Sequence, residues 1–319
     1  MRYMKKAKGL LLFNVENPTG HYELDLENCC DFSVAEQLCL LDRWECYVAE
    51  QHKLENVSQR GIRSCIRNEL YGDRPLQANE GVKTMADFIL PEHGELKFDY
   101  VSCKKPPAKA KALDKYAFDQ LLLTLQRAEC SAMDSVKALK SISHHWYLNS
   151  LQLRAITGIF KESEIRGDLC VDLMLRVIDM YNEKIFRARF ADKEEFRKLL
   201  HRLGHAAFFP FMQPEETAFS FDFAVEDQRI ACNILIQLAM SESMRNLREY
   251  RFIRKDGTVD YLVAGVPMSW SKLDCLDKAG TFEVYYACSA DDRNYKLRKA
   301  MMEKYAGAAV PPESEIKYW

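Results

Sequence analysis

A pattern near the start of the chain recurs late in it, and this recurrence constrains the fold more than any other feature. The first copy begins with FNVENPTGHYELDL at 13–26, and the second with FPFMQPEETAFSFDF at 209–223. Each joins a proline-containing turn to a run of alternating apolar and polar residues, which is typical of a half-buried strand. A helical pattern, a hairpin region, a glycine and a second alternating run follow in both. We therefore expect one α+β module to occur twice.

The two copies can be aligned residue by residue, although gaps are needed. Amphipathic strands also resemble each other by chance, so internal duplication is a hypothesis that needs a structure. The aligned pairs are Phe13 with Phe209, Pro18 with Pro214, Asp25 with Asp222 after a one-residue slip, Asp31 with Asp227 and Val34 with Ile230 once that slip is reversed, and Gly94 with Gly280 after a deletion.

Between the copies, residues 116–204 follow the helical period. Ser131 with Asp134, and Asn149 with Gln152, have the spacing of helix-capping pairs, and Gly204 is a typical helix stop. One predicted helix places Leu169, Leu173, Val177 and Met180 on a single face.

The expected fold is α+β, with two similar strand–helix–strand modules flanking a central all-helical module of about five helices. The expected domains are a first α+β module at 1–103, a Lys/Pro-rich linker at 104–115, a helical module at 116–205, and a second α+β module with a C-terminal helix at 206–319.

The central helices resemble the family named domain of unknown function 4476. The resemblance depends on Asp134 followed by Ala138 and Leu139, on the sequence SLQL at 150–153, on IF at 159–160 and on VID-x-x-N at 177–182. It covers about ninety residues, under a third of the chain, and its motif is mostly apolar periodicity. The resemblance implies an all-helical fold for this part and brings no established activity.

Composition limits the classes of function. Eleven cysteines, an odd number without a CxxC pair, fit a reducing compartment, and we expect a cytoplasmic protein. A net charge of −2 gives no global field that favours nucleic acid or an anionic membrane. No apolar stretch approaches the roughly 20 residues of a membrane span. The apolar run Leu10–Phe13 continues into polar residues, so it indicates a first strand and no signal peptide.

The thiols and histidines supply the first candidates for chemistry. Adjacent Cys29 and Cys30 could form a redox pair or lie at a helix entry, and Cys39, Cys46, Cys170 and Cys232 lie among apolar residues. His201 and His205, four apart in a predicted helix, could bind a metal or simply end that helix. His144 and His145 could titrate near neutral pH or pack locally. Either Cys170 or Cys275 could act as a nucleophile with one of these histidines.

Two polar features complete the candidates. Asp25 and Asp222 could form a carboxylate pair or lie on the solvent faces of strands. The lysine-rich segment 104–115 could contact nucleic acid or serve as a solvated connector.

The sequence therefore assigns no catalytic residue, cofactor or metal. It favours a non-enzymatic interaction or scaffold protein that binds an unidentified protein partner by strand addition or helix docking. The alternative is a thiol- or metal-dependent hydrolase, and nucleic-acid or membrane binding is not favoured. The oligomeric state stays open.

Overall fold

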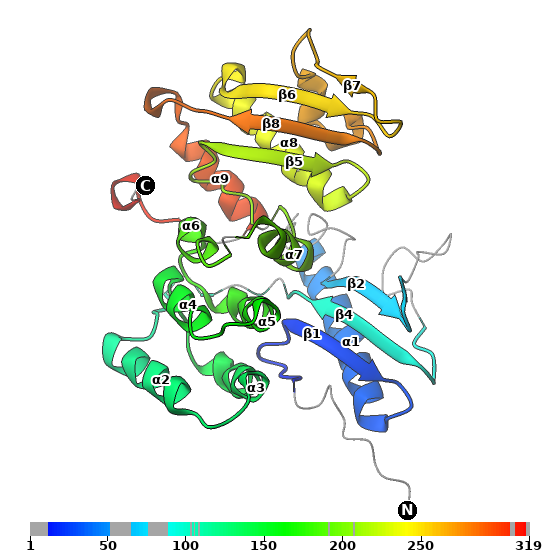
Figure 1. Ribbon diagram of the computed structural model, residues 1–319, viewed down its shortest axis with the longest axis vertical. Coiled ribbons are helices and arrows are strands. Elements are labelled where there is room, and N and C mark those ends of the chain that lie inside the picture. Colours follow the sequence, from blue (N-terminus) through cyan, green and yellow to red (C-terminus); the bar gives the residue numbers. More distant parts are fainter. Residues whose placement is uncertain are drawn as a thin grey trace, which may run out of the picture. The chain divides into compact units, whose positions relative to one another are not determined.

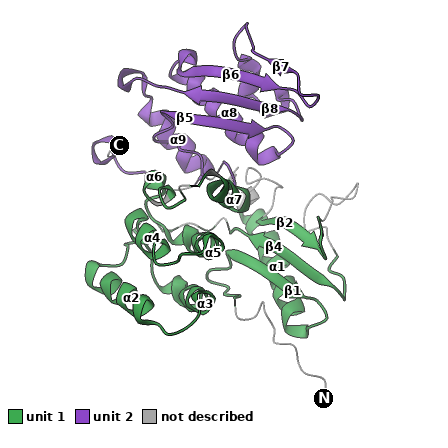
Figure 2. Cartoon of the chain, viewed as in Figure 1, with its two compact units in different colours: residues 1–57, 63–203 green, residues 58–62, 204–319 purple. Residues whose placement is uncertain are grey.

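The computed structural model describes residues 12–51, 65–75, 89–102, 104, 106–107, 109–190, 192–206, 208–306 and 310–316. The chain divides into two compact units, residues 1–57 with 63–203 and residues 58–62 with 204–319 (Figure 2). The described residues form nine α-helices and two four-stranded antiparallel sheets, which confirms the α+β class (Figure 1). Residues 1–57 and 63–103 of the expected first module fall in the same unit as 116–203 of the expected helical module.

The first sheet has the strand order β1-β4-β2-β3, with helix α1 packed on one face (Figure 1). Tyr22, Leu24 and Leu26 alternate toward α1 and are buried with Val34 and Leu38 of that helix. Each such side chain contributes about 1.5–3 kcal/mol when fully buried. The elements are β1 (Gly20–Asp25), α1 (Cys29–Gln51), β2 (Ile66–Tyr71), β3 (Arg74–Pro75) and β4 (Glu95–Tyr100).

The second sheet repeats this topology with the order β5-β8-β6-β7. Phe223, Phe252 and Phe282 surround the buried Trp270 in its core, with ring centroids 5.1–5.7 Å from the indole. Asp256 and Gly257 lie in the turn of a hairpin that joins the paired strands β6 and β7. The elements are β5 (Thr217–Asp222), α8 (Glu226–Ser241), β6 (Leu247–Ile253), β7 (Val259–Asp260), β8 (Thr281–Tyr286) and α9 (Tyr295–Tyr305).

Each sheet also has an equivalent backbone hydrogen bond just beyond its first strand. Leu26 N donates to Gly94 O at 2.9 Å, and Phe223 N donates to Gly280 O at 2.8 Å. Both β2 and β6 carry an irregularity in their pairing, and a residue with positive φ lies there in each, Asn68 at 57° and Glu249 at 53°. Because non-glycine residues rarely adopt this conformation, its recurrence marks the same local distortion in both sheets.

One detail of the sequence alignment is wrong. Asp25 N donates to Asp31 Oδ2, and the equivalent Asp222 N donates to Gln228 Oε1. Asp31 therefore corresponds to Gln228 and not to Asp227, and the one-residue slip before the strand persists through the helix. Asp227 accepts hydrogen bonds from the backbone N–H groups of His205 and Ala206 instead.

The intervening helices are more broken than the periodicity predicts. The capping pairs at Ser131 and Asn149 are confirmed, and Asn149 with Gln152 forms a full capping box. The helix expected to include Leu169 and Met180 ends at Leu173, because 3₁₀ turns follow at 174–176 and 180–182. The helices are α2 (Lys115–Arg127), α3 (Ala132–Ile142), α4 (Ser150–Thr157), α5 (Ser163–Leu173), α6 (Glu183–Arg187) and α7 (Lys193–Leu203).

Two further expectations concern single segments. The strand expected at Leu10–Phe13 lies partly outside the described residues, and Leu12 and Phe13 belong to no strand. In the described part of the chain, no helix has both the length and the apolar character required to cross a membrane.

Candidate functional site

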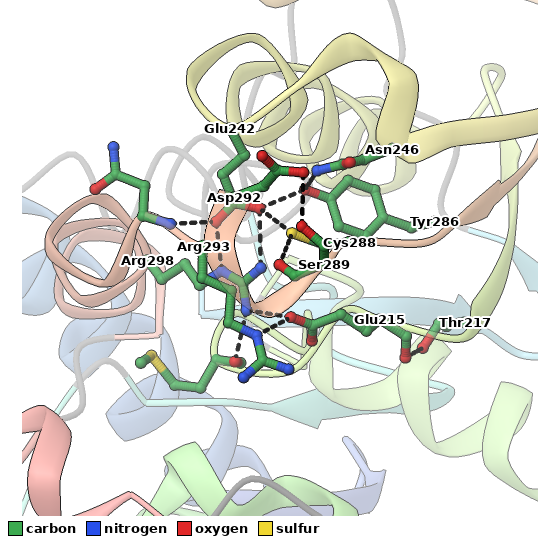
Figure 3. Close-up of polar contacts among 12 residues, drawn as sticks. Glu215, Thr217, Glu242, Asn246, Tyr286, Cys288, Ser289, Asp292, Arg293 and Arg298 are labelled. Atoms are coloured by element: carbon green, nitrogen blue, oxygen red, sulfur yellow. Dashed lines mark hydrogen bonds and ion pairs between the residues drawn. The ribbon is translucent and has the colours of Figure 1, made fainter.

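The most connected polar cluster in the described residues surrounds Arg298, on helix α9 in the second unit (Figure 3). Its fully buried guanidinium forms a bidentate ion pair with Glu242, through Nε at 2.7 Å and Nη2 at 2.9 Å. Nη1 donates to Glu215 Oε1 at 2.8 Å and to Met212 O at 2.9 Å. Arg293 Nε reaches the same Glu215 oxygen at 2.8 Å.

Glu242, which directly follows α8, accepts further hydrogen bonds. Tyr286 Oη donates to Oε2 at 2.7 Å, Cys288 Sγ at 3.3 Å, and Asn294 N donates to Oε1 at 2.8 Å. Burial opposes ionisation of Glu242, but the hydrogen bonds from Arg298, Asn294 and Tyr286 outweigh it, so the pKa of this carboxyl is lowered. This carboxylate is therefore charged and saturated with donors, an arrangement suited to holding α9 in place.

Cys288 lies within this cluster but is not activated. Burial, followed by the negative charge of Glu242, raises the pKa of its thiol to about 12. Because the thiolate is the nucleophilic form of cysteine, this thiol is unreactive near neutral pH.

The first sheet holds an equivalent glutamate. Glu45 on α1 accepts hydrogen bonds from Ser102 Oγ at 2.8 Å, Cys65 Sγ at 3.2 Å and Tyr100 Oη at 3.4 Å. Tyr100 and Tyr286 occupy the same strand position, since they pair with Gly20 and Thr217 at the start of β1 and β5. Both sheets thus direct a tyrosine hydroxyl at a helix glutamate.

Beside Glu45 lies Asp42, a fully buried carboxyl one helical turn earlier. Its Oδ1 accepts the Cys65 N–H at 2.6 Å, whereas its buried Oδ2 has no hydrogen-bond partner among the described residues. Burial raises the pKa of Asp42 to about 6, and the charge of Glu45 acts in the same direction. A buried carboxyl with one unsatisfied oxygen is a site of strain in the fold.

The turn at Asn17–Gly20 contacts a second buried ion pair. Lys140 Nζ on α3 contacts Asp172 Oδ1 on α5 at 3.0 Å, and it also donates to Thr19 O. Asn17 Nδ2 donates to Ser143 Oγ at 2.7 Å and to Asp172 O at 3.0 Å. This turn therefore joins the first sheet to the helices of its own unit.

A third cluster lies on the opposite face of the first sheet from α1. His21 Nδ1 and Arg202 Nε both contact Asp99 Oδ1, at 3.0 Å and 3.1 Å, and Arg202 Nη1 reaches Asp168 at 2.8 Å. The hydrogen bond to Asp99 raises the pKa of the half-exposed His21. His21 and Asp99 have the geometry of a proton-holding dyad, although the sequence singled out neither residue.

The histidines expected to bind metal are placed differently. Helix α7 ends at Leu203 and Gly204 has φ 105°, so His201 and His205 do not share a helical face. His144 lies in a 3₁₀ turn, with Nδ1 2.9 Å from Asn14 Nδ2 and its ring 3.7 Å from that of His145. Among the described residues, no group of three or more His, Cys, Asp or Glu could hold a metal ion.

The thiols and aspartates proposed from the sequence have local roles. Burial raises the pKa values of Cys170 and Cys232, and raises that of Cys39 to about 11. Cys29 and Cys30 lie at the first two positions of α1, and Cys275 is exposed. Asp25 and Asp222 have partners within their own turns, since Asp25 accepts from Glu27 N and Asp222 accepts from Ala224 N. The lysine-rich segment is bonded to a distant part of the chain, because Leu113 N donates to Tyr147 O.

Helix α1 carries an exposed apolar surface that the sequence analysis missed. Leu40, Trp44 and Tyr47 are 53%, 60% and 52% exposed, and the two aromatic rings are 5.9 Å apart. Their spacing of four and three residues places them on one side of the helix. We call these three residues the α1 ridge. A second apolar stripe, beside the buried stripe of Val34 and Leu38, was the signal available in the sequence.

Comparisons with protein-family models, with curated proteins and with solved structures found no match to this chain.

Proposed function

We propose that this protein is a non-enzymatic interaction protein and that the α1 ridge is a surface through which it binds a protein partner. The observation that carries the proposal is the exposure of Leu40, Trp44 and Tyr47 on one side of a single helix. Tryptophan and tyrosine are the residues most enriched among the energetically dominant positions of protein interfaces. Helix faces with anchors at this spacing dock into apolar grooves of partners.

The polar clusters support this proposal over the hydrolase alternative. Arg298 with Glu242, and Lys140 with Asp172, are buried pairs whose geometry joins elements of the fold. All the described thiols whose pKa departs from the ordinary value have it raised, which disfavours thiolate chemistry.

The repeated topology supports a second part of the proposal, that the chain arose by internal duplication. The equivalent strand orders, hydrogen bonds and bulges described above are its support. The likeness of the central helices to the domain of unknown function 4476 stays a prediction, as does a cytoplasmic location.

The test compares two exposed aromatic residues of the same unit. The tagged full-length chain, its Trp44→Ala variant and a control Tyr116→Ala are used for quantitative affinity capture from the cells that make the protein. Tyr116 on α2 is 76% exposed, so both changes remove a solvent-exposed ring. We expect a protein partner to be retained by the wild type and the control and to lose about tenfold in affinity with Trp44→Ala.

Two outcomes would contradict the proposal. One is a set of captured proteins that Trp44→Ala leaves unchanged. The other is turnover of a small molecule by the purified chain with no specific capture at all.

A further inference from the structure

The two sheets have equivalent rows of residues on the face opposite their helix. In the first sheet, Asp99 of β4 lies between His21 of β1 and Arg67 of β2. In the second sheet, Tyr285 of β8 lies between Ala218 of β5 and Arg248 of β6. The strand registers make these rows correspond position by position.

The last turn of α7 covers the first row. Asn68 Nδ2 donates to His201 O at 3.2 Å, and Arg67 Nη2 donates to the same carbonyl at 3.5 Å. Arg202 Nε contacts Asp99 Oδ1 at 3.1 Å. Asp99 and Arg67 are consequently only 3% and 7% exposed. This row therefore binds the C-terminal end of a helix, because Arg67 of the row and the adjacent Asn68 donate to the terminal carbonyl of His201.

The second row has the same strand register and is exposed in the described part of the chain. Ala218 and Arg248 are exposed, and Tyr285 is half-buried. The neighbouring Arg251 is paired with Glu283 at 2.5 Å, whereas no described hydrogen bond or ion pair engages the Arg248 guanidinium. Arg248 occupies the position at which Arg67 donates to a helix-end carbonyl in the first sheet.

We infer that the row Ala218–Tyr285–Arg248 is a docking site for the C-terminal turn of an α-helix from a partner protein. The inference rests on the proposed interaction function and adds a second surface to it. Charge complementarity identifies the occupant, because the end of a helix exposes unpaired carbonyl oxygens and carries a partial negative charge. Arg248 supplies the matching donor.

The side chains of the row define the partner further. In the first sheet, the polar His21 and Asp99 accommodate Arg202 of the docked helix. The second sheet presents the small Ala218 and the ring of Tyr285 at these positions. The partner helix therefore carries an apolar residue where α7 carries Arg202, and the residue before it supplies a free carbonyl, as His201 does in α7.

The experiment places a photoreactive amino acid at Ala218 of the full-length chain in the cells that make the protein. A control chain has the same amino acid at Asp256, an exposed residue in the β6–β7 turn of the same unit. Crosslinked residues are identified by mass spectrometry, in chains with Arg248 intact and in chains with Arg248→Glu. We expect crosslinks from position 218 to the last turn of a helix in a second protein, and a yield reduced about tenfold by Arg248→Glu.

Several results would overturn the inference: no crosslink from position 218, a crosslink to an extended segment, to another part of this chain or to a second copy of it, or a yield that Arg248→Glu does not change. Specific capture that still depends on Trp44 would then show that only the second surface fails. Loss of both the Trp44-dependent capture and the crosslinks would instead remove the proposed function itself.

Discussion

Glu45 and Glu242 occupy equivalent helix positions in the two sheets, yet their surroundings differ. Glu242 is held by the buried guanidinium of Arg298, which α9 contributes directly after the second sheet. The described hydrogen bonds to Glu45 come from neutral donors, and a second buried acid, Asp42, lies one turn away. On helix α8 of the second unit, Ala239 occupies the position that Asp42 has on α1. One backbone arrangement therefore keeps a buried carboxyl in both sheets, while the described groups that stabilise this carboxyl differ.

The largest expected effect comes from removing the cation. Arg298→Ala leaves Glu242 and Glu215 buried without their main partner, and breaking a buried pair in this way costs about 3–5 kcal/mol. We expect this loss in the free energy of unfolding of the second unit, measured by hydrogen exchange of the β8 amides. Lys299→Ala, at a partly exposed position that forms a surface pair with Glu303, is the control. A loss below 1 kcal/mol for Arg298→Ala would show that the cluster is not what holds α9.

The next effect has the opposite sign and depends on pH. The folded-state pKa of Asp42, about 6, lies above its ordinary 3.8, so ionisation of Asp42 destabilises the fold increasingly as pH rises from about 4 to 6. Asp42→Asn retains an acceptor for Cys65 N and removes this charge. At 1.36 kcal/mol per pKa unit, we expect stabilisation of up to about 3 kcal/mol above pH 6 and little below pH 4.

Denaturant unfolding of the first unit between pH 4 and 8 measures this difference. Asp119→Asn, at an exposed carboxyl paired with Lys115, is the matched control. A stability gain for Asp42→Asn that is equal at all pH values would contradict the account of a buried charge.

Gly20 and Thr217 test the packing around the two edge strands. A Cβ at Gly20 would collide with Lys140 Nζ and Asp172 Oδ1, whereas the same strand position in the second sheet already carries threonine. Gly20→Ala should therefore destabilise the first unit by about 1–3 kcal/mol. Thr217→Ala should change the second unit by roughly 0.5 kcal/mol or less. Equal effects in thermal unfolding would contradict the close approach of Lys140.

The smallest expected effect concerns His21, which corresponds to Ala218. Its hydrogen bond with Asp99 raises its pKa above 6.5, so its extra stabilisation is fully present below pH 6.5 and is lost as pH rises through the folded-state pKa. Because the ring is half-exposed, water limits the effect to less than about 1 kcal/mol. His21→Gln should narrow the stability difference between pH 6 and pH 8, measured by chemical denaturation. An unchanged pH profile of stability would show that the His21–Asp99 hydrogen bond does not stabilise the fold.

The elements that sequence reasoning predicted are those determined by neighbouring residues. The alternation of Tyr22, Leu24 and Leu26 predicted β1, and the capping pairs at Ser131 and Asn149 predicted two helix starts. The same local logic failed after Leu173, where apolar residues continue at helical spacing although the chain turns to pair Val177 with Leu148. Tertiary contacts override periodicity at that point.

The buried polar clusters could not be predicted, because their members are far apart in sequence. Lys140 and Asp172 are separated by 32 positions, Glu242 and Arg298 by 56, and Asp99 and Arg202 by 103. Nothing in the local pattern distinguishes Arg298 from the other basic residues of α9. The α1 ridge could have been found, since Leu40, Trp44 and Tyr47 have helical spacing within a segment already expected to be helical.

The close approach at Gly20 has a consequence for how the chain reaches its native state. Two sheets with one strand order and one register offer each edge strand a second place to pair, and exchange between similar modules is a characteristic folding error. Were β5 to pair with β4 in place of β1, the side chain of Thr217 would meet the ammonium group of Lys140. We therefore expect the absence of a side chain at Gly20 to favour correct over crossed pairing of the edge strands.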